Sequence, residues 1–200
     1  MDKRCLLIGE GREEVRFFSW LIHQIGLARD FHIEPYEGKN RLRFYLSALK
    51  NKPAIRNLEF LLVTRDADAN PASAFQSVVD ALQSHGFAAP QEPGTFASGN
   101  PHVGVFILPD GKKEGALEDL CLKSVEADRA MPCVEDFFEC LRENSVEQSS
   151  PTKARVHAFL ASRPDPDLRL GEAAEKGYWD FDHAAFNGLK EFFTRCARGG

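Results

Sequence analysis

The order of short apolar runs and helical segments limits the fold of this chain more than any other feature. Residues 4–9 (RCLLIG) form an apolar run that ends at glycine, which is typical of a buried strand. In residues 12–26, apolar side chains recur at the spacing of one helix face: Val15, Phe18, Ile22 and Ile25. The chain is therefore expected to begin with a strand, a tight turn and a helix.

The same order recurs along the next hundred residues. Further strands are predicted at 31–35 (FHIEP), 58–64 (LEFLLVT) and 102–108 (HVGVFIL). Helices are predicted at 40–50, from Pro71 to the residue before Gly86, and at 115–125, with Asn70 as the cap of the second. Strands that alternate with helices predict an α/β fold with a mainly parallel, four-stranded sheet and helices on both faces.

Beyond residue 128 the pattern becomes helical. An amphipathic stretch (VEDFFECL) precedes a polar connection (NSVEQSSPTK), and a helix through residues 156–160 follows. A last helix is expected from a cap at Asp182. We therefore expect an α/β core over residues 1–128 and extra C-terminal helices over residues 129–200, packed on that core as one domain.

Composition excludes several classes of protein. No apolar stretch approaches the ~20 residues of a membrane span, so a cytoplasmic protein without a membrane partner is expected. The five cysteines are spread out and lack a CxxC pair, which argues against a disulfide framework or a zinc finger. The net charge of −5 gives no overall basic footprint for nucleic acid.

Charge is nevertheless unevenly distributed. Between residues 38 and 57 there is no acidic residue but there are six basic ones: Lys39, Arg41, Arg43, Lys50, Lys52 and Arg56. Such a local basic face can hold phosphate groups. The alternative interpretation, a solvated helix flank, explains any one of these residues equally well.

Acidic residues follow three of the four predicted strands: Glu10 and Glu14 after the first, Asp66 and Asp68 after the third, and Glu118 and Asp119 after the fourth. The carboxyl ends of parallel strands meet at one edge of a sheet, where ligands bind. Asp66 and Asp68 point the same way if extended geometry continues through Ala67. Gathered carboxylates repel one another unless a cation neutralises them, and oxygen ligands favour Mg²⁺ or Mn²⁺.

Each acidic motif also has a purely structural interpretation. A DxD before Asn and Pro, taken alone, is more typical of a capped turn than of a metal site. Glu13 and Glu14 suit the first turn of any helix, because they complement its dipole. Glu10, which stands between two glycines, has no evident capping role. Dinucleotide binding is disfavoured, because a GxGxxG loop requires glycine where this chain has Glu14, and the chain contains no P-loop motif.

An apolar strand with Glu-Gly, a helix and a later strand with DxD together resemble the Toprim domain of topoisomerases, DnaG-type primases and OLD-family nucleases. Two further stretches, GALEDLC at 115–121 and KGYWDF at 176–181, are similar to motifs of small stand-alone Toprim-like proteins. This resemblance implies a Toprim-like, Rossmann-like fold and Mg²⁺-dependent phosphodiester chemistry. The residues that it implies for the site are Glu10, Glu14, Asp66, Asp68, Glu118 and a lysine, either Lys153 or Lys113.

The leading hypothesis is therefore nuclease-like hydrolysis of DNA or RNA. Glu10 and Asp66 would hold the principal ion, with Asp68 and Glu14 as further ligands and Glu118 at a second site. Lys153 would neutralise charge on the phosphate. One alternative is a non-catalytic module that binds metal and nucleotide or nucleic acid, with a separate partner protein in place of the ATPase of OLD nucleases. A receiver-like phosphoacceptor is a weaker alternative, because Pro109 stands where a Ser or Thr is expected.

Overall fold

The computed structural model describes residues 3–197, apart from the side chains of Ala54 and of Arg56, one of the six basic residues noted above. Its centre is one sheet in the order β2-β1-β3-β5-β4. Four strands run parallel: β1 (Cys5–Gly9), β2 (Phe31–Pro35), β3 (Phe60–Asp66) and β5 (His102–Leu108). The predicted α/β fold with a mainly parallel sheet is confirmed.

The predicted number of four strands is wrong, because a fifth strand lies at the sheet edge. Strand β4 (Phe96–Ala97) pairs antiparallel with β5 through only two residues. Two residues are too few to give an alternating apolar pattern, and the surrounding segment contains several prolines and glycines. Sequence periodicity therefore had no means of detecting this strand.

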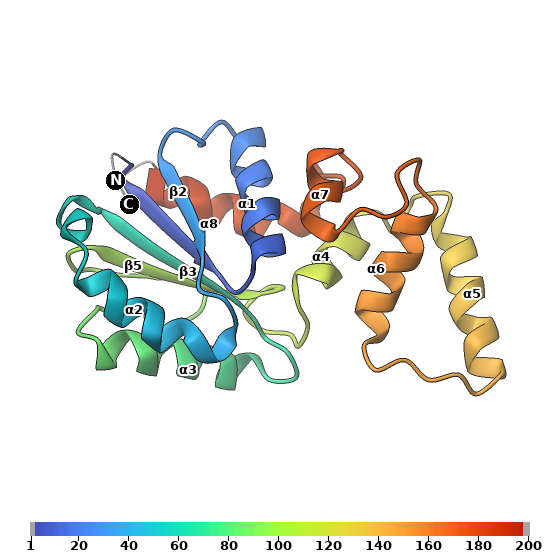
Figure 1. The fold of residues 1–200 in the computed structure, drawn as a ribbon, viewed down its shortest axis with the longest axis horizontal. Helices are drawn as coiled ribbons and strands as arrows, with labels where there is room; N and C mark the ends of the chain where they lie inside the picture. The colour runs from blue at the N-terminus through green and yellow to red at the C-terminus, as the bar shows by residue number, and fades with distance from the viewer. Residues whose placement is uncertain (1–2, 198–200) are drawn as a thin grey trace.

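Helices cover both faces of the sheet (Figure 1). One face packs against α1 (Arg12–Gln24) and α8 (Asn187–Ala197), with Leu7 and Leu62 directed into that core. The other face packs against α2 (Leu42–Lys50) and α3 (Pro71–Ser84), with Leu6 and Leu61 directed into a second core. Strands buried on both faces explain the nearly continuous apolar runs in the sequence.

The remaining helices connect or extend this core: α4 (Leu117–Ser124), α5 (Met131–Glu143), α6 (Pro151–Ala161) and α7 (Leu170–Glu175). Short 3-10 turns occupy Lys39–Arg41, Pro53–Asn57 and Ala184–Phe186. Helices α5 and α6 lie side by side beyond one end of the sheet (Figure 1). The core beside α1 contains residues from both sides of position 128. Between residues 3 and 197, none of the helices has the length and apolar character needed to cross a membrane.

The two predicted helix caps have different outcomes. Asn70 caps α3 as expected, because its Oδ1 accepts a hydrogen bond from the Ser73 N–H at 2.9 Å. The cap predicted at Asp182 is wrong, since α8 begins five residues later and is preceded by a 3-10 turn. The Asp182 N–H instead donates to Asp180 Oδ1 at 3.0 Å, and the His183 ring caps the 3-10 turn.

The sheet order places a crevice between β1 and β3. From β1 the chain moves outward through α1 to β2, and it then returns through α2 to β3 on the other side of β1. Helices α1 and α2 consequently cover opposite faces of the sheet. In open α/β sheets a ligand crevice forms at such a reversal, outside the carboxyl ends of the strands.

Candidate metal centre at the carboxyl ends of β1 and β3

Glu10 follows the last residue of β1, and its backbone is held from two sides. Its N–H donates to Glu14 Oε2 at 2.7 Å, and its carbonyl accepts from the Gly38 N–H at 2.8 Å. Within residues 3–197, the Glu10 carboxylate itself has no hydrogen-bond or ion-pair partner. A fixed backbone with a free carboxylate is a suitable arrangement for a ligand of a metal ion.

Glu14 lies in the first turn of α1, under the end of β1. A Cβ atom on Gly9 would lie 3.1 Å from Glu14 Oε2, so the glycine makes room for this carboxylate. Burial raises the pKa of Glu14 well above its usual value, and the charges of Asp66, Glu10 and Glu118 raise it further. Glu14 therefore belongs to a group of carboxylates that repel one another.

Asp66 is the last residue of β3, and β3 lies beside β1. Its Oδ1 accepts a hydrogen bond from the Leu117 N–H, the first of α4, at 3.1 Å. Burial is the main cause that raises the pKa of Asp66 to about 7, followed by the charge of Glu118 and then that of Glu10. A carboxyl that titrates near neutrality shows that its negative charge is poorly neutralised by the surrounding protein.

Glu118 and Lys153 complete the charged group. The Glu118 side chain is only 17% exposed, and its Oε1 lies 3.7 Å from Lys153 Nζ. Lys153, from α6, is 62% exposed and therefore keeps most of its contact with solvent. One exposed ammonium group cannot balance four nearby carboxylates.

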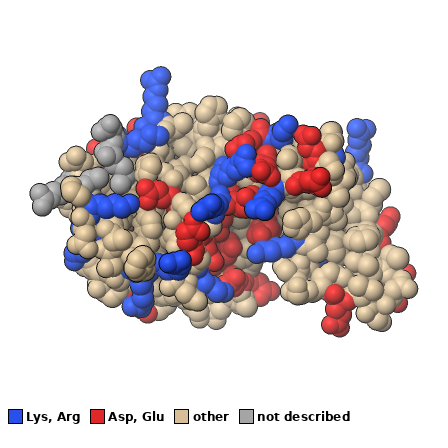
Figure 2. Space-filling view, viewed as in Figure 1, with Lys and Arg blue, Asp and Glu red and all other residues tan. Residues whose placement is uncertain are grey.

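These five side chains line one cavity of about 480 Å³, which opens between α1, β3, α4, α6 and α7. The structure therefore brings together five of the predicted site residues: Glu10, Glu14, Asp66, Glu118 and Lys153. Figure 2 shows acidic side chains gathered in the middle of the visible face, with basic side chains among and beside them. Acidic residues separated by more than a hundred positions thus meet at one place.

Two predicted candidates lie elsewhere. Extended geometry ends before Asp68, which has a φ of 50° and pairs through its backbone with Gly115. The Asp68 carboxylate contacts Lys39 Nζ at 3.1 Å and does not line the cavity. Lys113, the alternative to Lys153, lies 3.8 Å from Asp110 and is also outside the cavity.

Sequence reasoning missed several residues around the cavity: Arg12, His157, Arg169 and Leu170. Arg12 and Arg169 are exposed at its rim and bring positive charge from two distant segments. Arg12 directly follows the Glu10-Gly11 pair, and this position in the sequence could have identified it as a residue of the site. Arg169 precedes the six-residue helix α7, and nothing in the local sequence links that segment to the first helix.

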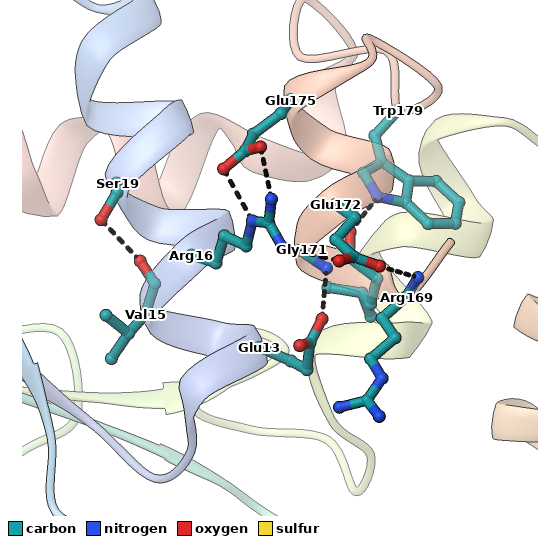
Figure 3. A network of polar contacts seen from close by, with 10 residues as sticks. Glu13, Val15, Arg16, Ser19, Arg169, Gly171, Glu172, Glu175 and Trp179 are labelled. Atoms are coloured by element: carbon teal, nitrogen blue, oxygen red, sulfur yellow. Dashed lines mark hydrogen bonds and ion pairs between the residues drawn. The ribbon is translucent and has the colours of Figure 1, made fainter. Parts of the chain in front are cut away.

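A brace between α7 and α1 sets one wall of the cavity (Figure 3). The Arg16 guanidinium forms ion pairs with Glu175 at 2.7 Å and with Glu172 at 2.8 Å. The Gly171 N–H donates to Glu13 Oε2 at 3.0 Å. The two adjacent acids of α1 both line the cavity but differ in their contacts, because Glu13 holds α7 while Glu14 accepts from the Glu10 N–H.

The ligand chemistry of this cavity fits a hard divalent cation. Glu10, Glu14, Asp66 and Glu118 offer carboxylate oxygens, and a cation would relieve the repulsion that raises the pKa of Asp66. In their present side-chain positions, however, no group of three His, Cys, Asp or Glu residues in the described chain is arranged to hold a metal ion. Glu14, Asp66 and Glu118 each turn toward a neighbouring N–H or ammonium group, so binding requires side-chain rotation.

Comparison with known proteins gives a family and a fold. The family described as "Protein of unknown function (DUF3226)" matches residues 4–198. Among solved structures, the chain is similar to the C-terminal region of the Xanthomonas campestris pv. campestris OLD protein, with a TM-score of 0.52 and 12% identity over 98% of this chain and 97% of the other. At that identity the similarity supports a shared fold alone. No curated protein matches significantly. Because the DUF3226 family model matches nearly all of its residues, the chain belongs to the DUF3226 family.

Proposed function

We propose that the protein is a metal-dependent phosphodiesterase that hydrolyses nucleic acid, and that its site is Toprim-like. The observation on which this rests is the meeting of Glu10, Glu14, Asp66 and Glu118 in one cavity, with Lys153 beside them. The fold shared with the OLD C-terminal region and the sequence resemblance to OLD-family nucleases support the same reaction class.

In this proposal, Glu10 and Asp66 hold the principal Mg²⁺ or Mn²⁺ ion. A divalent ion supplies Lewis-acid chemistry when bound, which lowers the cost of charge on the reacting phosphate. Glu14 and Glu118 add negative charge that strengthens cation binding, and Asp68, which is outside the cavity but close enough for its charge to raise the pKa of Asp66, would act through intervening water. Lys153 leaves Glu118 and pairs with a phosphate oxygen as negative charge develops there.

Hydrolysis joins the oxygen of a water molecule to phosphorus and breaks the bond from phosphorus to one sugar oxygen. The departing oxygen takes up a proton and leaves as an alcohol. Arg12 on α1, Lys153 on α6 and Arg169 directly before α7 line the cavity and would orient the phosphate. Positive groups at the rim and carboxylates at the base are the arrangement expected of a site for phosphate together with a metal ion.

Glu10→Gln is expected to lower Mn²⁺-supported cleavage of DNA or RNA by about 100-fold or more, because it removes an anionic ligand of the ion. The assay compares wild type and variant on single-stranded and duplex DNA and RNA, with EDTA as the metal-free arm. Glu135→Gln is a matched control, since Glu135 is exposed on α5 and pairs with Arg155 away from the cavity.

Equal cleavage by wild type and Glu10→Gln would contradict the proposal. Calorimetric Mn²⁺ binding without turnover on any of the four substrates would replace it with the alternative of a non-catalytic metal-binding module. Absence of both binding and turnover would remove the metal centre as well.

A further inference from the structure

The outer surface of α2 exposes an aromatic ring that packing does not require. Leu42, Leu46 and Leu49 bury one side of the helix, so Phe44 faces outward and is 71% exposed. The Arg41 guanidinium carbon lies 5.9 Å from the centre of the Phe44 ring. An exposed phenylalanine beside an arginine presents a free aromatic face next to a positive charge, a surface on which a base can stack beside its phosphate.

Neighbouring side chains leave the Phe44 ring uncovered, and basic residues stand on either side of it in the sequence. Ser47 and Ala48, one turn further along α2, are exposed and too small to cover the ring. We define the α2 basic face by five exposed residues: Lys39, Arg41, Arg43, Phe44 and Lys50. Residues 38–57 contain no acid, although the whole chain has a net charge of −5. Lys39 is paired with Asp68, so Arg41, Arg43 and Lys50 supply the positive charge that makes the α2 basic face complementary to a polyanion.

The α2 basic face also begins at the candidate metal centre. The Gly38 N–H donates to the Glu10 carbonyl, and the next residue, Lys39, contacts Asp68 at 3.1 Å. In Figure 1 the start of α2 lies near the carboxyl end of β3. Phe44 lies six positions after Gly38, which corresponds to about 10 Å along a helical segment. A polymer bound at Phe44 would thus reach Glu10 within a few monomers of its chain.

We propose that the α2 basic face binds a single-stranded segment of nucleic acid and leads it to the metal centre. A base stacks on the Phe44 ring, while Arg41 and Arg43 contact the adjoining phosphates. Stacking on an exposed aromatic ring requires an unpaired base with a free face, whereas the bases of a duplex are stacked on each other. The choice of a nucleic-acid substrate rests on the proposed function, but the binding surface can be tested without catalysis.

The test measures binding of fluorescein-labelled oligothymidine to the full-length protein by anisotropy, in EDTA so that no cleavage occurs. Phe44→Ala is expected to weaken binding about tenfold, because stacking of one base is lost. Phe44→Trp is expected to bind within about twofold of wild type, since it keeps a stacking surface. Arg41→Gln is expected to reduce the slope of log affinity against log salt by about 0.7, the value for one phosphate contact on a single strand.

A matched control separates stacking from a general loss of surface. Phe137, on α5, is also an exposed phenylalanine, at 51%, and it lies among acidic residues instead of basic ones. Phe137→Ala is expected to bind oligothymidine as wild type does. Both substitutions are at exposed positions, so both variants are expected to fold, and thermal unfolding checks that they do.

Equal losses in Phe44→Ala and Phe137→Ala would overturn the inference, as would unchanged binding in Phe44→Ala or absence of binding in wild type. Sedimentation that shows a dimer broken by Phe44→Ala would instead assign this face to a second copy of the chain, which also overturns it. The binding assay contains no metal, so its result is independent of the cleavage assay. If Phe44→Ala loses binding while wild type shows no cleavage, this inference stands and only the catalytic proposal is rejected.

Discussion

Asp66→Asn is expected to stabilise the metal-free protein at about pH 8, and at the same time to abolish Mn²⁺-supported cleavage. The asparagine keeps an oxygen that can accept the hydrogen bond from Leu117, so α4 retains its N-terminal contact. It removes one of the charges that raise the pKa of Glu14. Most point substitutions destabilise a protein, whereas a gain in stability with a loss of function is the outcome expected where like charges are gathered for a ligand.

The pH dependence follows from the raised pKa of Asp66. In the folded protein this pKa is about 7, whereas the ordinary value is 3.8. Between these values the folded state keeps a proton that the unfolded state has lost, so stability falls as pH rises and stays low above about pH 7. The full effect of this shift on the free energy of unfolding is on the order of 4 kcal/mol, and most of it falls between about pH 5 and about pH 7.

Denaturant unfolding in EDTA at about pH 5 and about pH 8 measures this effect. Wild type is expected to lose stability between the two conditions, and Asp66→Asn is expected to lose less, with the remaining loss due to Glu14, whose pKa is raised mainly by burial. Added Mn²⁺ should stabilise wild type at the higher pH and leave the variant nearly unchanged, because only wild type keeps the ligand. A variant that is less stable than wild type at pH 8 would show that the Asp66 charge is already compensated within the fold.

Gly171→Ala is expected to destabilise the protein by about 2–3 kcal/mol, because the close packing of α7 on α1 leaves no space for a methyl group. The added Cβ would lie 2.7 Å from the Glu13 carbonyl oxygen and 2.8 Å from Arg16 Cβ. Neither contact can be relieved by rotating the end of a flexible side chain. Helix α7 must therefore move, and Arg169 and Leu170 in the cavity wall move with it.

Gly188→Ala provides the matched control for this substitution. Gly188 also lies in a helix, α8, but its added Cβ would meet only the Phe106 ring at an ordinary 3.6 Å. Alanine is favoured over glycine in a helix by roughly 1 kcal/mol, so Gly188→Ala should be neutral or stabilising. Thermal unfolding compares the two variants. Equal stability of Gly171→Ala and wild type would show that the brace in Figure 3 does not fix the position of α7.

The parts of the fold that could be predicted are those specified by local pattern. The apolar runs of β1, β3 and β5 were identified because both faces of each strand are covered, which gives long apolar stretches. The start of α3 was specified by Asn70 and Pro71. Strand β4 could not be predicted, because its two residues are placed by pairing with β5 and not by a pattern of their own.

The candidate site shows the same division. Glu10 and Asp66 were identified because they follow buried strands, and parallel strands bring their carboxyl ends to one edge. Asp68 was expected beside Asp66, but its backbone turns to pair with Gly115, a contact fixed by the loop after β5. Arg169 could not be identified, since only the packing of α7 on α1 brings it to the cavity. Local sequence thus predicted the residues on strand ends, while tertiary packing decided which other side chains join them.

Glu10 and Asp66 are proposed to hold one divalent ion between them. The most direct measurement is a crystal structure of the protein soaked in Mn²⁺, with anomalous diffraction to locate the metal. An anomalous peak is expected in the cavity between β1 and β3, within about 2.0–2.3 Å of an oxygen of each carboxylate. A Mn²⁺-soaked crystal with no peak at this edge of the sheet, or with a peak bound by other residues, would contradict this proposal.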